Sequence, residues 1–456
     1  MREAKMSAER MTGAVAGVSR SKWNALVIFL VLDLIQILTV SLMYLDESTV
    51  LVVGFDLSRH NPFLSASLFF MVVGFQVLMI YLLAFRVRAS KDLVRLYPTL
   101  SMNVSSGCKF AAEEIVRWTL EIAERSGQKV REVYLMRSPL PNAFTFSLPL
   151  LGTVVVLHSN LLDLLSPEEV RAIIAHEVGH VKNRDSMVSI LTRMPSVFVD
   201  AIYFYIYVRL LLASVVALLV NLNPALALVR AGMLFGFFIL SRAMVFLGHL
   251  VVTRASRAAE LLSDYHAAEL LGFETTINAL TVLGQRVEAV TALIEEVRWL
   301  ESLNPARTQP ISGTELGQMI QSYPLDGIDE DNARQAAPRL FLRNKLAALR
   351  DVYGVSISDE EVERMIRPAI DRLITKRSKD SASLRDTREK KTIDWRSADS
   401  NSDQRLTGQE LTDLVRLLRE NPGKLLFDNE ISQNLLAMDH PDFRSRVLFL
   451  ADVYGV

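Results

Sequence analysis

The sequence predicts a mostly α-helical integral membrane protein that also carries a soluble domain with a small β-sheet. Half of the 456 residues are hydrophobic and the mean hydropathy is positive, although 22% of the residues are charged. The hydrophobic residues are concentrated in four long apolar stretches, which predict four transmembrane helices. Three short strand candidates, separated by turns that contain Pro or Gly, lie between residues 130 and 160 and predict the sheet.

The overall composition excludes some classes of function. The formal net charge is only −1, so the sequence makes no case for a nucleic-acid partner. Cys108 is the single cysteine, which excludes an internal disulfide and a cysteine-based zinc site. A single thiol also agrees with a reducing compartment.

The first apolar hairpin follows a basic N-terminal segment, residues 1–22. Its two stretches, 23–44 and 63–85, are each long enough to cross a bilayer. Basic residues flank both outer ends and the connecting loop is acidic, so the N-terminus and the chain after residue 86 are expected in the cytoplasm. The alternatives are a signal peptide, which the long first stretch does not favour, and a hairpin buried in a soluble core.

A second apolar hairpin is expected at 198–220 and 225–252, joined by a tight connection. Five ionisable residues interrupt these stretches: Asp200, Arg209, Arg230, Arg242 and His249. Such residues within a span usually face protein or water rather than lipid. If both stretches span, residues 86–197 and 253–275 lie on the same side of the membrane; the alternative is a soluble pair of long helices.

The segment between the hairpins is expected to form the first part of a soluble domain. Residues 109–126 have helical periodicity, which stops at Gly127. The strand candidates follow: Arg131–Met136, Asn142–Phe146 and Thr153–Ser159. An exposed edge of this sheet could pair with an extended peptide and hold it in place.

A helix is then predicted from the sequence SPEEVRAIIAHEVGHVKNRD, residues 166–185. Ser166 and Glu169 form a Ser-x-x-Glu capping box, and Pro167 suits the first helical turn. Apolar residues recur at helical spacing after them, so one face of the helix is apolar.

This helix carries the H-E-x-x-H pattern of zinc metalloproteases. His176 and His180 are four residues apart and share one face, so both imidazoles can bind a single ion. Glu177 then lies beside the ion without binding it and is left to act on a water molecule. The alternative is an amphipathic helix with two surface histidines.

A third ligand is expected in the helical segment 256–272. Catalytic zinc commonly has three protein ligands and one open position. Glu260 and Asp264 are four residues apart, so one carboxylate can bind the metal while the other accepts a hydrogen bond from a ligating imidazole. Spacing alone favours Glu260 only modestly, and a charged solvent face is the alternative; His266 points to a different face.

Two segments of the chain resemble the HtpX-type membrane zinc proteases: HEVGHVKNRD and SRAAELLSDYHAA. They are about seventy residues apart, with two apolar stretches between them. The wider family includes the CAAX prenyl proteases. The resemblance covers roughly residues 23–275 and includes the run from PNAFTF to HEVGH. It implies a zincin-type (gluzincin) α+β catalytic domain with one zinc ion per chain.

The resemblance also implies roles for individual residues. His176, His180 and Glu260 become zinc ligands, Glu177 the general base, and Asp264 a residue behind the ligands. Three residues are implied for the substrate-binding edge: Asn142, Ala143 and Phe144.

Two further matches are weaker. Asp185 matches an acidic position of the family and is expected to have a structural role behind the ligands. DHPDFRSRV at 439–447 is similar to a family element in which His440 and Arg446 could donate hydrogen bonds to the oxyanion of the tetrahedral intermediate. Asp439 replaces the Thr of that element, and an ordinary surface histidine before proline is the alternative.

The C-terminal part, 276–456, is expected to be a helical extension. Residues 343–355 and 444–456 both end in DVYGV, which indicates a duplicated helical unit or a chance echo. Residues 376–406 are polar and poor in hydrophobic residues, so a disordered insert is expected there. Helices are predicted in four segments: 276–300, 338–350, 358–375 and 408–420.

These interpretations define six segments: 1–22, a cytosolic basic N-terminus; 23–85, a transmembrane hairpin; 86–197, the catalytic domain with the HEVGH helix; 198–252, a second transmembrane hairpin; 253–275, the part with the third zinc ligand; and 276–456, the extension. The function expected from the resemblance is hydrolysis of misfolded or excess membrane proteins at the cytosolic face, as quality control. The partners are then polypeptides and the lipid bilayer. The alternatives are a CAAX prenyl protease-like enzyme and a non-catalytic zinc-binding scaffold; the charged residues around HEVGH argue against a site within a span.

Overall fold

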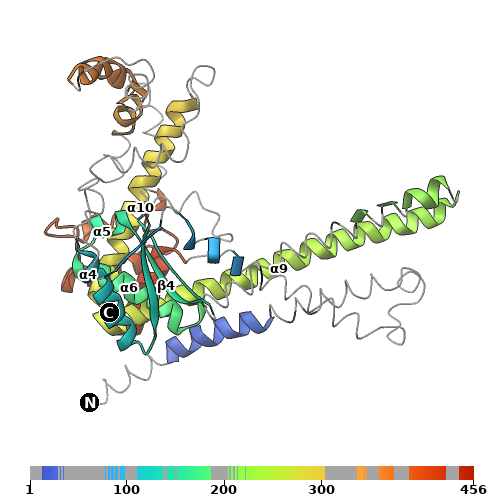
Figure 1. Ribbon diagram of the computed structural model, residues 1–456, viewed down its shortest axis with the longest axis horizontal. Coiled ribbons are helices and arrows are strands. Elements are labelled where there is room, and N and C mark those ends of the chain that lie inside the picture. Colours follow the sequence, from blue (N-terminus) through green and yellow to red (C-terminus); the bar gives the residue numbers. More distant parts are fainter. Residues whose placement is uncertain are drawn as a thin grey trace. The chain divides into compact units, whose positions relative to one another are not determined.

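The structure is a computed structural model, and it describes the greater part of the chain (Figure 1). Isolated positions are also described between 31 and 82, between 204 and 212, and between 345 and 358. The continuous described segments are 13–28, 84–86, 88–90, 93–97, 110–136, 141–148, 151–185, 214–220, 222–302, 336–343, 360–373, 390–427 and 441–456.

Within these residues the protein is mostly helical and contains a small mixed sheet, as predicted. The strands are β1 (Leu93–Arg95), β2 (Val130–Met136), β3 (Ala143–Leu148) and β4 (Gly152–His158). The helices with defined bounds are α4 (Ala112–Arg125), α5 (Ser159–Leu164), α6 (Pro167–Lys182), α9 (Pro224–Leu271), α10 (Phe273–Ser302), α14 (Gly408–Glu420) and α15 (Phe443–Tyr454), with a short 3-10 helix at Trp395–Ser397. Further helical residues lie at 13–28, 214–219, 336–343 and 360–373.

The chain divides into two compact units. The first comprises residues 1–15, 91–183 and 260–456, and the second comprises 16–90 and 184–259. The sheet, α4 to α6 and the C-terminal helices belong to the first unit. α9 contributes its first 36 residues, 224–259, to the second unit and its last turns to the first.

The sheet has the strand order β1-β2-β4-β3. β2 and β4 are parallel, while β1 pairs antiparallel with β2 and β3 pairs antiparallel with β4. The three strand candidates of the sequence therefore correspond to β2, β3 and β4, and β1 is an additional strand. In the described part of the chain β3 lies at the edge of the sheet.

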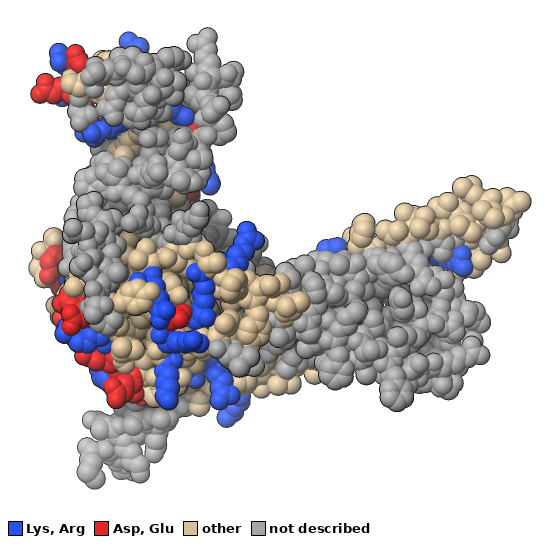
Figure 2. Space-filling model, in the orientation of Figure 1, with Lys and Arg blue, Asp and Glu red and all other residues tan. Residues whose placement is uncertain are grey.

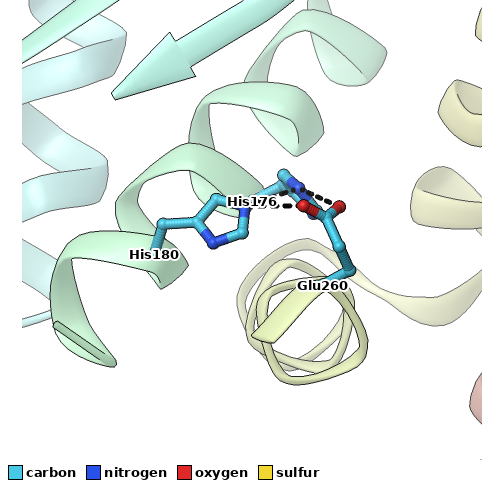
Figure 3. Close-up of side chains that lie close together, drawn as sticks. All are labelled: His176, His180 and Glu260. Carbon is cyan, nitrogen blue, oxygen red and sulfur yellow. Dashed lines mark hydrogen bonds and ion pairs between the residues drawn. The ribbon is translucent and has the colours of Figure 1, made fainter. Parts of the chain in front are cut away.

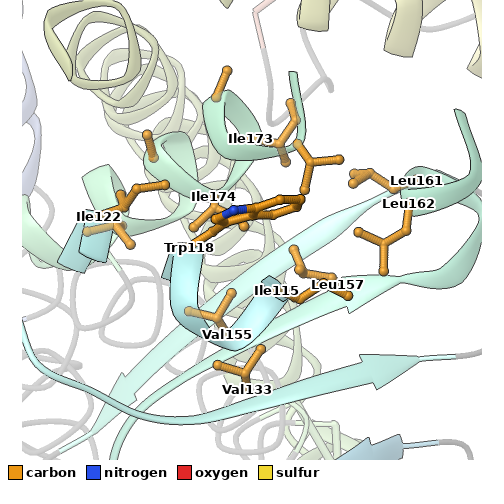
Figure 4. Close-up of a cluster of buried hydrophobic side chains, with 14 of the residues drawn as sticks. Ile115, Trp118, Ile122, Val133, Val155, Leu157, Leu161, Leu162, Ile173 and Ile174 are labelled. Carbon is orange, nitrogen blue, oxygen red and sulfur yellow. The ribbon is translucent and has the colours of Figure 1, made fainter. Parts of the chain in front are cut away.

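The core of the first unit lies between the sheet and α4, α5 and α6 (Figure 4). Trp118 and Ile115 of α4 pack with Leu157 of β4 and Ile174 of α6, and all four side chains are buried. This packing holds α6 against the sheet. It stabilises a helix whose own hydrogen bonds would be marginal in water, because most helical stability in proteins comes from tertiary packing.

The predicted capping box at the start of α6 is present. Ser166 Oγ accepts a hydrogen bond from the Glu169 backbone N at 3.3 Å, and the Glu169 carboxylate accepts one from the Ser166 backbone N at 2.8 Å. Arg405 adds to this arrangement, since its Nε donates to Glu169 Oε1 at 2.8 Å. A side chain of the C-terminal extension thus binds the first turn of the HEVGH helix.

The second part of the expected disordered insert is folded instead. Residues 390–406 contribute Ile393, Trp395 and Leu406 to a buried cluster with residues of α10, α14 and α15. With Ala398, four apolar side chains anchor an otherwise polar segment, which explains why composition alone gave the wrong prediction. The first part of the insert lies outside the described residues, as does most of the repeat at 343–355.

Two described helices, α9 and α10, are long and apolar enough to cross a membrane by length and composition. The apolar stretch of α10 is mostly buried inside the first unit, which is equally typical of a core helix. The apolar stretch of α9 is exposed, and Figure 2 shows this helix as mostly uncharged. Of the four predicted spans, 225–252 lies wholly within the described α9. The span 198–220 is described in part, chiefly at 214–220, while 23–44 and 63–85 fall largely outside the described residues.

Candidate active site

α6 and the last turns of α9 cross at very close range within the first unit. Gly179 is the residue that permits this approach: a Cβ atom at this position would lie 3.0 Å from the Ser263 Cα and 3.3 Å from the His266 Cβ. Any other residue would push the two helices apart. The glycine of HEVGH therefore brings the carboxylates of α9 to the histidines of α6.

His176, His180 and Glu260 meet at this crossing (Figure 3). Nε2 of His176 lies 3.1 Å from Nε2 of His180. The Glu260 carboxylate approaches both rings, with Oε2 3.4 Å from His176 Nε2 and Oε1 3.5 Å from His180 Nε2. His176 and Glu260 are buried and His180 is partly buried.

These spacings fit a tetrahedral metal ion. Zinc bonds of about 2.0–2.1 Å at tetrahedral angles place neighbouring ligand atoms about 3.3–3.4 Å apart. The two Nε2 atoms are 3.1 Å apart and lie 3.4 and 3.5 Å from different oxygens of Glu260, so the separations are close to this value. Three ligand atoms also leave one position open, as a catalytic rather than a structural metal site requires. The group could therefore hold a metal ion.

Side chains of α9 orient both imidazole rings. Nδ1 of His176 donates to Asp264 Oδ1 at 2.8 Å, and Nδ1 of His180 lies 3.1 Å from Ser263 Oγ. Ser263 and Asp264 are completely buried. These contacts at Nδ1 fix the orientation of both rings so that their Nε2 atoms face Glu260. Residues behind a metal commonly orient its histidine ligands in this way.

Arg446 of α15 completes this arrangement from the far end of the sequence. Its Nε and Nη2 donate to the two oxygens of Asp264 at 2.7 and 2.6 Å, and its Nη2 lies 3.7 Å from Glu260 Oε2. Burial alone would raise the pKa of Asp264, but the Arg446 guanidinium holds that pKa below its usual value. Arg446 thus reaches the site, through a contact with Asp264 that the sequence did not reveal; its oxyanion role stays a prediction.

The carboxylates change the protonation of His176 in the metal-free protein. Burial alone would lower the pKa of His176, but hydrogen bonds to Asp264 and Glu260 raise the pKa to about 10. The ring is therefore protonated at neutral pH without a metal. Since a ligating histidine must be neutral, metal binding has to displace this proton.

Glu177 lies next to His176 on α6 and is buried. Thr145 of β3 donates a hydrogen bond from Oγ1 to Glu177 Oε2 at 2.8 Å. The residue expected to act on water is therefore tied to the edge strand of the sheet. The sequence analysis did not single out Thr145, although its alternation with Ala143 along a strand could have placed it on the side of the sheet that faces α6.

The substrate-edge residues implied by the resemblance lie at the start of this same strand. The Asn142 carbonyl accepts a hydrogen bond from the His158 backbone N at 3.0 Å, and its side chain accepts one from the Ala143 N at 2.9 Å. Phe144 lies on the other face of the sheet, with its ring edge-to-face with His158. His158 is not a member of the metal-binding group.

Asp185 belongs to the second unit, where it forms a buried ion pair with Lys22. His440 lies outside the described residues. His266 points away from the group, as expected, with its Nε2 2.9 Å from Ser126 Oγ and its Nδ1 3.2 Å from Lys182 Nζ.

Known proteins resemble this chain over the region that builds the group. Residues 111–317 match the family model described as peptidase family M48. A protease HtpX homologue of Aeropyrum pernix is 34% identical over 190 residues, which are 41% of this chain and 56% of the relative. Homologues of Methylacidiphilum infernorum and Saccharolobus solfataricus are 26% and 28% identical, over 47% and 51% of this chain and 71% and 67% of their own lengths.

The matched region contains α4, the sheet from β2 onward, α6 with HEVGH, and the last turns of α9 with Glu260. The chain spans little more than half the length of the first of these relatives. The resemblance to HtpX-type proteases predicted from HEVGH and the Glu260 segment is thus confirmed, and residues 111–317 match peptidase family M48.

Proposed function

We propose that this protein is a membrane-bound, zinc-dependent endopeptidase that hydrolyses peptide bonds of polypeptides. The observation that carries the proposal is the tetrahedral spacing of His176, His180 and Glu260 beside Glu177. The relatives are named proteases, which agrees with this reaction.

In the proposed reaction His176, His180 and Glu260 hold one zinc ion. When bound, zinc supplies a Lewis acid that polarises the scissile carbonyl and makes water a better nucleophile. Glu177 accepts the proton of the attacking water and delivers it to the leaving amine. Asp264 keeps the His176 ring in its binding orientation through the 2.8 Å hydrogen bond. Arg446 and His440 would donate hydrogen bonds that stabilise the oxyanion.

The substrates we propose are misfolded or excess membrane proteins, cleaved at the cytosolic face. The exposed apolar part of α9 supports attachment to a bilayer, because large apolar side chains on the surface of a long helix are stable in lipid. Basic residues at the ends of the first predicted hairpin support the cytosolic orientation. A site next to the bilayer would reach cytosolic segments of membrane proteins first.

The test compares the purified full-length protein with two variants, using casein and a membrane-protein substrate, with and without a zinc chelator. Glu177→Gln is expected to keep zinc and lose cleavage by at least about 10³-fold, because the general base is removed while the ligands remain. His176→Ala is expected to lose zinc as well. Unchanged cleavage by Glu177→Gln, or an unchanged ratio of zinc to protein in His176→Ala, would overturn the proposal.

The same assay separates the alternatives. Zinc binding without cleavage of any substrate would identify a non-catalytic scaffold. Cleavage restricted to a farnesylated peptide would identify a CAAX prenyl protease-like enzyme.

A further inference from the structure

The edge strand β3 presents alternate backbone groups away from its neighbour β4. The His158 backbone N donates to the Asn142 carbonyl, so residues 142 and 158 form a hydrogen-bonded pair. In an antiparallel ladder such pairs alternate with pairs whose N–H and C=O groups point outward. With the register Ala143–Leu157 and Thr145–Val155, the backbone groups of Ala143 and Thr145 point to the edge.

Ala143, Thr145 and Ser147 are the outward-facing residues of β3 in this register. The N–H of Ala143 donates to the side chain of Asn142 at 2.9 Å, which caps the first position of the edge. Thr145 is the next outward-facing residue along the strand. An extended peptide that pairs with this edge, as in β-augmentation, would run along the strand that carries Thr145.

The side chain of Thr145 points to α6, where Oγ1 donates to Glu177 Oε2 at 2.8 Å. Successive side chains of a strand point to opposite faces, so this direction is independent of what the backbone binds at the edge. One residue thus connects the edge of the sheet with the carboxylate beside the candidate metal ligands.

The other hydroxyl on the same face of β3 behaves differently. Ser147 Oγ lies 2.9 Å from Thr153 Oγ1 on β4, so it serves the pairing of two strands. A hydroxyl on β3 does not need Glu177 as a partner in order to be satisfied. This contrast singles out the Thr145–Glu177 contact as a feature of the site rather than of the strand.

We propose that Thr145 is a positioning residue that fixes the Glu177 carboxylate relative to β3, the strand at which we propose an extended substrate binds. This inference rests on the proposed peptidase function. The hydroxyl holds Oε2, which stops the carboxylate from rotating and assigns Oε1 to accept the proton of the attacking water. Because the donor sits on the substrate-binding strand, the distance between the scissile bond and the base is set by one residue.

The test uses the full-length zinc-loaded protein and four variants. Thr145→Val keeps the shape but removes the hydroxyl, Thr145→Ser keeps the hydroxyl, and Thr145→Ala supplies a second hydroxyl-free variant if valine disturbs folding. Ser147→Ala removes the neighbouring hydroxyl on the same face and is the matched control. For each variant kcat and KM for a peptide, the zinc-to-protein ratio and the thermal midpoint are measured.

We expect Thr145→Val and Thr145→Ala to lower kcat about 10- to 100-fold with KM and zinc content unchanged, because a misplaced group beside the reacting atoms costs rates of this order. Thr145→Ser is expected to recover most of the lost kcat, and Ser147→Ala to match the wild type. Wild-type kcat in a folded hydroxyl-free variant would overturn the inference. So would a loss of zinc or of folding in both hydroxyl-free variants, since either would indicate a purely structural role.

These outcomes are distinct from failure of the proposed function. If the wild-type protein cleaves no peptide, or cleaves equally well after chelation, the proposed peptidase itself fails. If wild-type cleavage depends on zinc and on Glu177 while Thr145→Val is fully active, only the inference about Thr145 fails.

Discussion

α9 divides near Ala255 into two unequal parts, which we call the first half (224–254) and the second half (255–271). The first half has exposed apolar side chains and the second half has buried polar ones. In the first half Leu228, Phe235 and Phe246 are 75%, 66% and 58% exposed. In the second half Glu260, Ser263 and Asp264 are 7%, 0% and 0% exposed. The backbone is one uninterrupted helix throughout, so side-chain chemistry alone distinguishes the two halves.

The side chains of one continuous helix therefore suit two different environments. Large apolar side chains on the outside are unfavourable in water and favourable in lipid, which agrees with the span we propose for the first half. Buried carboxylates are unfavourable anywhere unless they are paired, and the second half pairs them with His176, His180 and Arg446.

The largest effect is expected where the second half supplies a metal ligand. Glu260→Ala should reduce zinc affinity by at least about 10³-fold, because it removes one of only three protein ligands. The zinc-to-protein ratio after dialysis against a graded chelator measures this change. Glu274→Ala, near the start of α10, is the control and should bind zinc like the wild type. An unchanged zinc affinity in Glu260→Ala would show that Glu260 of α9 is not a metal ligand.

The next effect concerns the buried charge on the same half. Arg446→Leu should reduce the free energy of unfolding of the metal-free protein by about 3 kcal/mol, because it removes the guanidinium that donates two hydrogen bonds to the buried Asp264 carboxylate and leaves the protonated His176 ring to balance that charge. Denaturant titration in detergent, followed by tryptophan fluorescence, measures it.

The exposed pair of Arg419 and Asp452 offers a control for that change. Their atoms are 2.8 Å apart and both side chains are at least half exposed, so Arg419→Leu should cost at most about 1 kcal/mol. If both variants were equally stable, the Arg446–Asp264 pair would contribute no more than a surface contact.

The parts of the site that share an element were accessible to sequence reasoning. The i, i+4 spacing places His176 and His180 on one face, and the structure brings Glu260 to the same point. Arg446 could not be found in this way, because it reaches Asp264 across 182 residues and no local pattern encodes that distance. Thr145 was missed for a related reason, since its partner lies on another element.

The fold was predictable where it depends on local signals. The capping box at Ser166 marks the start of α6, and the turns mark β2 to β4. The continuity of α9 was not predicted, because 225–252 was expected to be a span and 256–272 a separate helical segment. Charged residues do not interrupt helical hydrogen bonding, and Arg254 Nε instead donates to Ser21 Oγ at 3.1 Å.

A smaller effect is expected from a charge in the first half. Phe235→Lys should disfavour insertion by about 3 kcal/mol, because a lysine near the middle of a span is costly. The fraction of protein that resists extraction from membranes by alkaline carbonate measures this. Leu228→Lys, near the start of α9, should cost less because the side chain can reach the interface. If neither variant changes extraction, the first half does not face lipid.

The smallest effect is expected in the second half of α9, where Ser263 Oγ lies 3.1 Å from Nδ1 of His180. Ser263→Ala should weaken zinc binding by about 10-fold, because the ring loses the partner that orients it while all three ligands remain. Ser241→Ala is the matched control: Ser241 is also buried on α9, but in the first half, where it bonds to the Phe238 carbonyl at 2.8 Å. Equal weakening by both variants would show that α9 responds as a single unit, and the distinction between its halves would then fail for the metal site. Weakening by Ser263→Ala alone, with the helical content of both variants unchanged, would show that the second half is specialised to hold the ligands, down to a single hydroxyl group.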